Sequence, residues 1–139
     1  RPMAEVLQRL GSKHVMVVHS EDGLDEISIA APTHVVELNN GEITEYSIDP
    51  ADYNLSHTSL EALVVDDAIG SLRLIKQAFA GEAGAPLDML LLNAGAAIYS
   101  ADLVVDLATG IEQARIAISS GAAQQKLDDL IQFTQGLNP

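Results

Sequence analysis

Hydrophobic and polar positions follow three different patterns in the first third of the chain. Residues 3–10 carry apolar side chains at helical spacing between Pro2 and Gly11, which predicts a short helix. Residues 15–18 (VMVV) form an uninterrupted apolar run, typical of a strand that is buried on both faces, as in parallel sheets. Two alternating runs, residues 35–38 and 42–48, are joined at Asn40 and Gly41, which tolerate positive φ and so predict a β-hairpin.

The rest of the chain has the periodicity of helices. Residues 66–80 repeat apolar side chains at steps of three and four, and Gly81 ends the pattern. Residues 86–97 (PLDMLLLNAGAA) are apolar on nearly all sides, as in a helix buried between other elements. Two more helices are expected over about residues 102–118 and 122–133. The side chains expected to face inward in these two helices include Leu103, Leu107, Ile111, Leu127, Leu130 and Ile131.

These elements predict one domain of the α/β class, in which a mixed β-sheet with a β-hairpin is flanked by helices. The hairpin supplies an antiparallel section, and we expect the strand over residues 13–19 to belong to a parallel section beside it. With 139 residues, 47% of them hydrophobic, the chain can bury one ordinary core.

Composition narrows the classes of partner. Twenty acidic residues against seven basic ones give a formal charge of −13. This charge disfavours nucleic acids and anionic membrane surfaces, which require clustered lysine and arginine, and it is compatible with binding cations. The absence of cysteine excludes disulfides and thiolate metal sites and favours a cytoplasmic location. No apolar run approaches the roughly 18 residues that indicate a membrane helix.

The most distinctive polar stretch directly follows the apolar strand. Residues 19–26 (HSEDGLDE) hold four carboxylates around a glycine, which predicts a loop where α/β sheets commonly place ligands. Asp25 and Glu26 are adjacent, and adjacent carboxylates in a loop can share Mg²⁺, an ion that prefers oxygen ligands and keeps several waters. The spacing alone leaves a solvated acidic turn open as the alternative.

Other candidate groups favour structural roles. His19 and Ser20 are neighbours in sequence and are not expected to face one another, so we expect a hydrogen-bonded structural histidine rather than a catalytic base. The remaining histidines, His14, His34 and His57, are scattered, which disfavours a histidine metal cluster.

Two short polar or small-residue stretches are interpreted in the same way. Asp66 and Asp67 are expected to cap the helix that follows them. Residues 93–96 (NAGA) lie within the apolar helical run and indicate close packing rather than an anion site. The seven basic residues form no local cluster, so the phosphates of a polyphosphorylated substrate would need residues outside this chain.

Residues 17–28 (VVHSEDGLDEIS), followed by APTHVVEL and NGEI, closely resemble the central region of anthranilate phosphoribosyltransferases. Residues 90–99 (LLLNAGAAIY) resemble a helical signature of the same family, in the same order and at the same spacing. The resemblance covers nearly the whole chain. It implies the three-layer α/β/α catalytic domain of phosphoribosyltransferases and nucleoside phosphorylases, here as an incomplete domain.

The activity implied by this resemblance is a transfer reaction of tryptophan biosynthesis, carried out by a pentosyltransferase. The amine of anthranilate displaces pyrophosphate from C1 of phosphoribosyl pyrophosphate and gives N-(5-phosphoribosyl)anthranilate. The implied cofactor is Mg²⁺. The family motif that matches residues 23–26 implies that Asp25 and Glu26 are the metal ligands, and no catalytic residue is assigned in this chain.

Several segments of the family pattern precede, in the sequence order of the family, the region that this chain resembles. They are the glycine-rich phosphoribosyl pyrophosphate loop, the Lys-His-Gly-Asn segment, a substrate-binding arginine and the small helical domain through which the enzymes dimerise. We therefore expect residues 1–139 to be the C-terminal portion of the catalytic domain, inactive alone, within an enzyme that is a homodimer. A related nucleoside phosphorylase, which would need no acidic magnesium loop, and a non-catalytic acidic binding module are the alternatives.

Overall fold

Strands occupy the first third of the chain, and helices dominate the remainder. The computed structural model describes residues 1–137. Its elements in chain order are α1 (Pro2–Arg9), β1 (His14–Ser20), β2 (Thr33–Asn39), β3 (Glu42–Ile48), the 3₁₀ helices η1 (Pro50–Tyr53) and η2 (Glu61–Leu63), α2 (Ala68–Phe79), α3 (Ala85–Ser100), α4 (Leu107–Ser119) and α5 (Ala122–Gln135). The predicted α/β class is confirmed.

The sheet has the order β1-β2-β3, and both strand pairs are antiparallel. The predicted hairpin is confirmed: Asn40 and Gly41 join β2 to β3 with φ values of 48° and 91°. The expected parallel section is not found among residues 1–137, where β1 pairs only with β2. Residues 15–18 are half-buried rather than buried on both faces, and an apolar run does not indicate the direction of the neighbouring strand.

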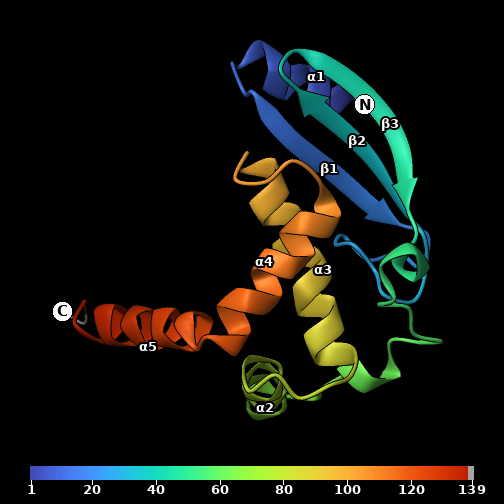
Figure 1. Ribbon diagram of the computed structural model, residues 1–139. Helices are drawn as coiled ribbons and strands as arrows, with labels where there is room; N and C mark the ends of the chain where they lie inside the picture. The colour runs from blue at the N-terminus through green and yellow to red at the C-terminus, as the bar shows by residue number, and fades with distance from the viewer. Residues whose placement is uncertain (138–139) are drawn as a thin grey trace.

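Helices cover both faces of the sheet. Val35 belongs to the main core, to which α3 and α4 contribute. Its neighbour Val36 points to the opposite face because successive strand residues alternate, and there α1 packs with Ala4 fully buried. Figure 1 shows α1 on one side of the sheet and α3 with α4 on the other. The three-layer arrangement implied by the resemblance is therefore present around three strands.

Helix α3 is the central element of the core. Of its residues only Ala97 is exposed, as the apolar pattern of residues 86–97 predicts. A Cβ atom built on Gly110 of α4 would collide with the carbonyl oxygen of Gly95, and one built on Gly95 would lie 2.7 Å from the backbone nitrogen of Ile111. The interpretation of the NAGA stretch as a site of close packing is confirmed.

Helix α4 begins later than the sequence pattern predicts. Residues 102–106 precede it, with Asp102 at a φ of 57° and Leu103 74% exposed instead of inward. Asp106 caps the helix, because its carboxylate accepts a hydrogen bond from the Thr109 amide at 2.7 Å. The helical spacing of apolar residues continues through the preceding loop, so the sequence pattern does not reveal that the helix begins after Asp106.

Helices α2 and α5 leave part of their apolar side chains exposed. Asp67 caps α2, as predicted, by accepting a hydrogen bond from the Gly70 amide at 2.7 Å. In α5, Leu130 and Ile131 are exposed rather than inward, because this helix packs mainly against α4 and projects away from the sheet (Figure 1). Within residues 1–137, no helix combines the length and apolar character that crossing a membrane requires.

A buried carboxylate connects the sheet to the C-terminal end of α3. Glu37 of β2 accepts hydrogen bonds from the hydroxyls of Tyr46 at 2.7 Å and Tyr99 at 2.8 Å. It also contacts Nε2 of His14 at 2.9 Å, and Nδ1 of the same ring lies 2.6 Å from the carboxylate of Asp102. Burial alone would raise the pKa of Glu37, but the hydrogen bonds from Tyr46, Tyr99 and His14 outweigh it and lower that pKa.

We expect Glu37 to stabilise the fold only while it is ionised. Its pKa in the folded chain lies below the ordinary value of 4.5, so its contribution is complete above that value and is lost as the pH falls through the folded-state pKa. Glu37→Gln should lower the free energy of unfolding near neutral pH by roughly 2 kcal/mol, the scale of hydrogen bonds to a charged group. Urea unfolding should show this difference shrinking under acidic conditions, and a difference independent of pH contradicts the assignment.

Gly110→Ala tests the close contact between α3 and α4. The added methyl group would meet backbone atoms of Gly95, so the two helices must separate to admit it. We expect the free energy of unfolding to fall by roughly 1 to 3 kcal/mol, as is usual when a packed core is overfilled. Gly136→Ala is the matched control, because its φ of −73° is helical and the nearest atom would lie 3.4 Å away. Equal stability of both variants in urea unfolding would show that the contact is not tight.

Candidate functional site

The acidic loop, residues 21–32, begins directly at the end of β1. The Ser20 amide donates a hydrogen bond to the Leu24 carbonyl, and the Gly23 amide donates one to the Ser20 carbonyl, both at 3.0 Å. Gly23 has a φ of 92°, a conformation that residues with side chains rarely adopt, so this tight turn requires glycine. The Glu21 amide donates to the Pro32 carbonyl at 3.0 Å, which brings the two ends of the loop together.

Asp22 has a structural role inside this loop. Its carboxylate accepts hydrogen bonds from the Leu24 amide at 3.3 Å and from the Ser28 hydroxyl at 2.5 Å. Burial opposes its ionisation, but hydrogen bonds from the hydroxyls of Ser28 and Ser20 lower the pKa of Asp22. One of the four carboxylates therefore holds the loop together, a role that the sequence left unassigned.

Asp25 and Glu26, the predicted metal ligands, are both exposed. In the described part of the chain, no hydrogen bond or ion pair engages either carboxylate. The pair offers only oxygen ligands, which suits Mg²⁺. No group of three or more histidine, aspartate or glutamate side chains within residues 1–137 is arranged to hold a metal. The pair therefore fits an ion that keeps several waters and takes further ligands from a phosphate group.

The segment after Glu26 turns into the core. Ile27 and Ile29 are at most 2% exposed and belong to the main hydrophobic cluster. Between them, the Ser28 amide donates a hydrogen bond to the Thr33 hydroxyl at 3.1 Å. The carboxylate pair thus stands at the point where an exposed turn becomes a buried, hydrogen-bonded segment.

Asn93 of α3 contacts this loop, and the sequence interpretation missed that contact. Its side-chain oxygen accepts a hydrogen bond from the Ile27 amide at 3.0 Å, and its side-chain nitrogen donates one to the Ile27 carbonyl at 2.9 Å. The sequence interpretation treated the NAGA stretch only as a packing element. A polar side chain within an apolar helical run was the available signal, because a buried amide requires hydrogen-bond partners.

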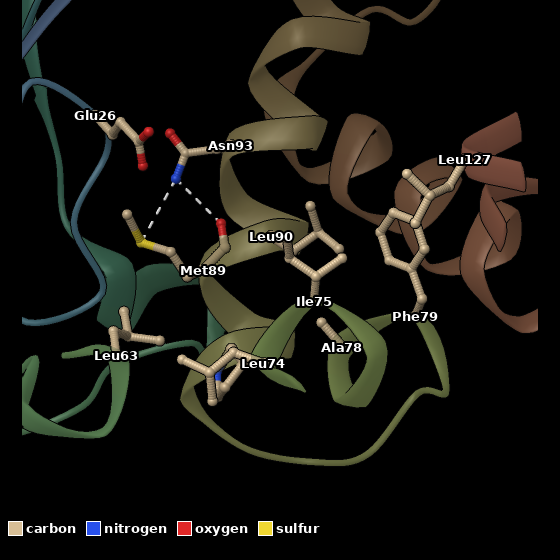
Figure 2. Close-up of a pocket in the computed structure, with 11 residues that line it drawn as sticks. Glu26, Leu63, Leu74, Ile75, Ala78, Phe79, Met89, Leu90, Asn93 and Leu127 are labelled. Carbon is tan, nitrogen blue, oxygen red and sulfur yellow. Dashed lines mark hydrogen bonds between the residues drawn. The ribbon is translucent and has the colours of Figure 1, made fainter. Parts of the chain in front are cut away.

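A cavity of about 490 Å³ opens beside the acidic loop. Figure 2 shows Glu26 and Asn93 projecting toward each other at one end, with apolar side chains along the rest. The apolar lining comes from η2, α2, α3 and α5 and consists of Leu63, Leu74, Ile75, Ala78, Phe79, Pro86, Met89, Leu90 and Leu127. Asp25 is not part of this lining, so the two adjacent carboxylates have different surroundings.

The histidines contact carboxylates other than this pair or face solvent. His57 Nε2 lies 2.7 Å from Asp88 of α3, and His34 Nε2 lies 3.7 Å from Glu45 of β3. His19 is exposed, and the hydrogen bond expected for its side chain is not found among residues 1–137. Successive strand residues point to opposite faces, so His19 and the buried Ser20 do not form a base and nucleophile pair.

Comparison with known proteins gives a consistent result. Residues 1–124 match the family described as "Glycosyl transferase family, a/b domain". The anthranilate phosphoribosyltransferases of Stutzerimonas stutzeri (strain A1501) and Thioalkalivibrio sulfidiphilus (strain HL-EbGR7) are 56% and 55% identical to this chain, each over 96% of it. The chain spans only 40% and 39% of the lengths of these two relatives.

Solved structures show the same fold. Anthranilate phosphoribosyltransferase from Thermus thermophilus is 34% identical, with a TM-score of 0.83 over 96% of this chain and 39% of that one. The Saccharomyces cerevisiae enzyme, in complex with phosphoribosyl pyrophosphate and Mg, is 21% identical, with a TM-score of 0.76 over 89% of this chain and 36% of that one, which is a likeness in fold alone. Because the family match covers most of its length, the chain belongs to the glycosyl transferase family that this a/b domain defines.

Proposed function

We propose that this chain is part of an anthranilate phosphoribosyltransferase. In this reaction the amine nitrogen of anthranilate forms a bond to C1 of phosphoribosyl pyrophosphate and loses a proton, while the bond from C1 to the pyrophosphate oxygen breaks. The products are N-(5-phosphoribosyl)anthranilate and pyrophosphate, a step of tryptophan biosynthesis. The observation that carries the proposal is the 56% identity, over 96% of the chain, to a relative of this name.

Asp25 and Glu26 are the residues proposed to hold Mg²⁺. The bound ion would stabilise the negative charge that develops on the departing pyrophosphate. The two carboxylates have no other partners within residues 1–137, so they can bind a cation without first breaking existing contacts. The complex of the yeast relative with phosphoribosyl pyrophosphate and Mg supports the use of this ion.

Residues 1–139 are proposed to form the C-terminal portion of the catalytic domain. The chain spans 40% of the Stutzerimonas relative, which supports its being only a part of such an enzyme, and its acidic loop has no basic neighbour in the hydrogen bonds and ion pairs of residues 1–137. Arg1, for example, pairs with Glu5 and Glu45 instead. The residues that bind the phosphates would therefore lie elsewhere in the full-length protein, which we propose to be a cytoplasmic homodimer.

Combining Asp25→Ala with Glu26→Ala in the full-length protein tests the metal site. We expect kcat/KM for phosphoribosyl pyrophosphate to fall roughly 100-fold at a fixed Mg²⁺ concentration, the scale of losing groups that stabilise developing charge. The fold should be retained, because both side chains are exposed. Steady-state kinetics over a range of Mg²⁺ concentrations provide the measurement.

The control for this experiment removes the same number of carboxylates elsewhere on the surface. Glu21→Ala combined with Glu82→Ala changes one exposed residue of the acidic loop and one outside it. This control should keep the Mg²⁺ dependence of the unaltered enzyme. An Asp25 and Glu26 double variant that also keeps it would remove the proposed role.

The chain on its own should not consume anthranilate, because the proposed phosphate-binding residues are missing from it. The assay follows anthranilate fluorescence with phosphoribosyl pyrophosphate and Mg²⁺ present, and circular dichroism checks that the chain is folded. Turnover by residues 1–139 alone would contradict the proposal that the phosphate-binding residues lie elsewhere in the full-length protein. Phosphate-dependent cleavage of a nucleoside by the full-length protein, without anthranilate turnover, would instead establish the phosphorylase alternative.

A further inference from the structure

The side-chain amide of Asn93 makes three hydrogen bonds to backbone partners. Its oxygen accepts from the Ile27 amide, and its nitrogen donates to the carbonyls of Ile27 at 2.9 Å and Met89 at 3.1 Å. Figure 2 shows the contact with Met89 one turn earlier on α3. Exchanging the oxygen and nitrogen would place the oxygen against two carbonyl oxygens, so these contacts determine the orientation of the amide.

This amide fixes one end of the segment that carries the carboxylate pair. Ile27, the residue after Glu26, has both backbone groups bound to Asn93. At the other end, Leu24 precedes Asp25, and its carbonyl accepts a hydrogen bond from the Ser20 amide at 3.0 Å, at the end of β1. The backbone of the carboxylate pair is therefore held between a strand on one side and helix α3 on the other.

A second contact from α3 reaches the same segment two residues further on. His57 Nε2 lies 2.7 Å from the Asp88 carboxylate of α3, and the His57 amide donates a hydrogen bond to the Ile29 carbonyl at 2.7 Å. This contact is indirect and restrains Ile29, whereas Asn93 binds the residue next to Glu26. Asn93 is therefore the side chain of α3 with the most direct control over the carboxylate pair.

We propose that Asn93 is a positioning residue, which holds the backbone at Ile27 and thereby restrains the segment that carries Asp25 and Glu26, the proposed ligands of the magnesium ion of a pyrophosphate group. This proposal rests on the proposed function and adds a residue on which the geometry of the metal site depends. Asn93 itself does not touch the ion or the reacting atoms. Its loss should weaken metal binding through the loop, because ligands whose supporting contacts are removed typically lose about 10- to 100-fold in metal affinity.

Two variants distinguish the effect of the loop's position on cation binding from the effect of a nearby charge. Asn93→Ala removes the three hydrogen bonds to the backbone and the weaker one to the Met89 sulfur, and it retains a residue that favours helix. Asn93→Asp keeps the size of the side chain and an acceptor for the Ile27 amide, but it places an oxygen against the carbonyls of Ile27 and Met89. Asn93→Asp also adds a negative charge on the side of the cavity that faces Glu26, and that charge by itself would strengthen cation binding.

Isothermal titration of the full-length protein with Mg²⁺, in the presence of inorganic pyrophosphate, provides the first measurement. We expect both variants to bind Mg²⁺ roughly 10-fold more weakly, Asn93→Asp included despite its added charge. Leu90→Met, a change of similar volume on the same helix and in the same cavity, is the matched control and should bind normally. Unchanged affinity in both Asn93 variants, or tighter binding by Asn93→Asp, would overturn the proposal.

Hydrogen exchange at single backbone amides provides the second measurement, which does not depend on the metal. In Asn93→Ala the Ile27 amide should exchange at least about 10-fold faster, because it has lost its acceptor, while the Ser20 amide should keep its rate. Equal acceleration at both amides would indicate general destabilisation and overturn the proposal. Failure of the unaltered protein to bind Mg²⁺ with pyrophosphate would instead refute the proposed function, whatever the exchange rates show.

Discussion

Burial of helix α3 is the constraint on which the rest of the structure depends. A helix that is covered on nearly all sides must also satisfy its few polar side chains, because an unpaired buried polar group is costly. The contacts are Asp88 with His57, Asn93 with Ile27, and Tyr99 with Glu37. All three partners come from the first half of the chain. The polar side chains of α3 thus connect this helix to the sheet through Glu37 and to the acidic loop through Ile27.

The close contact between α3 and α4 determines the rotation of α3 about its axis. Each residue of an α-helix is rotated by about 100° from the one before it, so residues two positions apart point in nearly opposite directions. Gly95, which touches the backbone of Gly110, therefore lies on the opposite side of α3 from Asn93, which reaches the loop. Rotating the helix would move both contacts at once. Backbone contact on one side and hydrogen bonds on the other leave α3 a single favourable orientation.

Short sequence patterns predicted those parts of the fold that depend only on residues close together in the chain. The hairpin at Asn40 and Gly41 and the cap at Asp67 depend on a few neighbouring residues, and both were predictable from the sequence. The direction of the strand next to β1 and the start of α4 were not, because pairing depends on distant residues and the apolar spacing runs through the loop before Asp106. The contact between Asn93 and Ile27 spans 66 positions, so no local pattern specifies it.

Carboxylates have two different roles in the acidic loop. Asp22 is bound by the Leu24 amide and the Ser28 hydroxyl, so its charge is already compensated within the loop. Asp25 and Glu26 are equally acidic but have no such partners within residues 1–137, although the backbone on either side of them is held. Both carboxylates are therefore exposed to solvent on a stretch of backbone that is held at each end. A cation would give this pair the compensation that Asp22 already receives within the loop, which is why we propose this pair, and not Asp22, as the metal ligands.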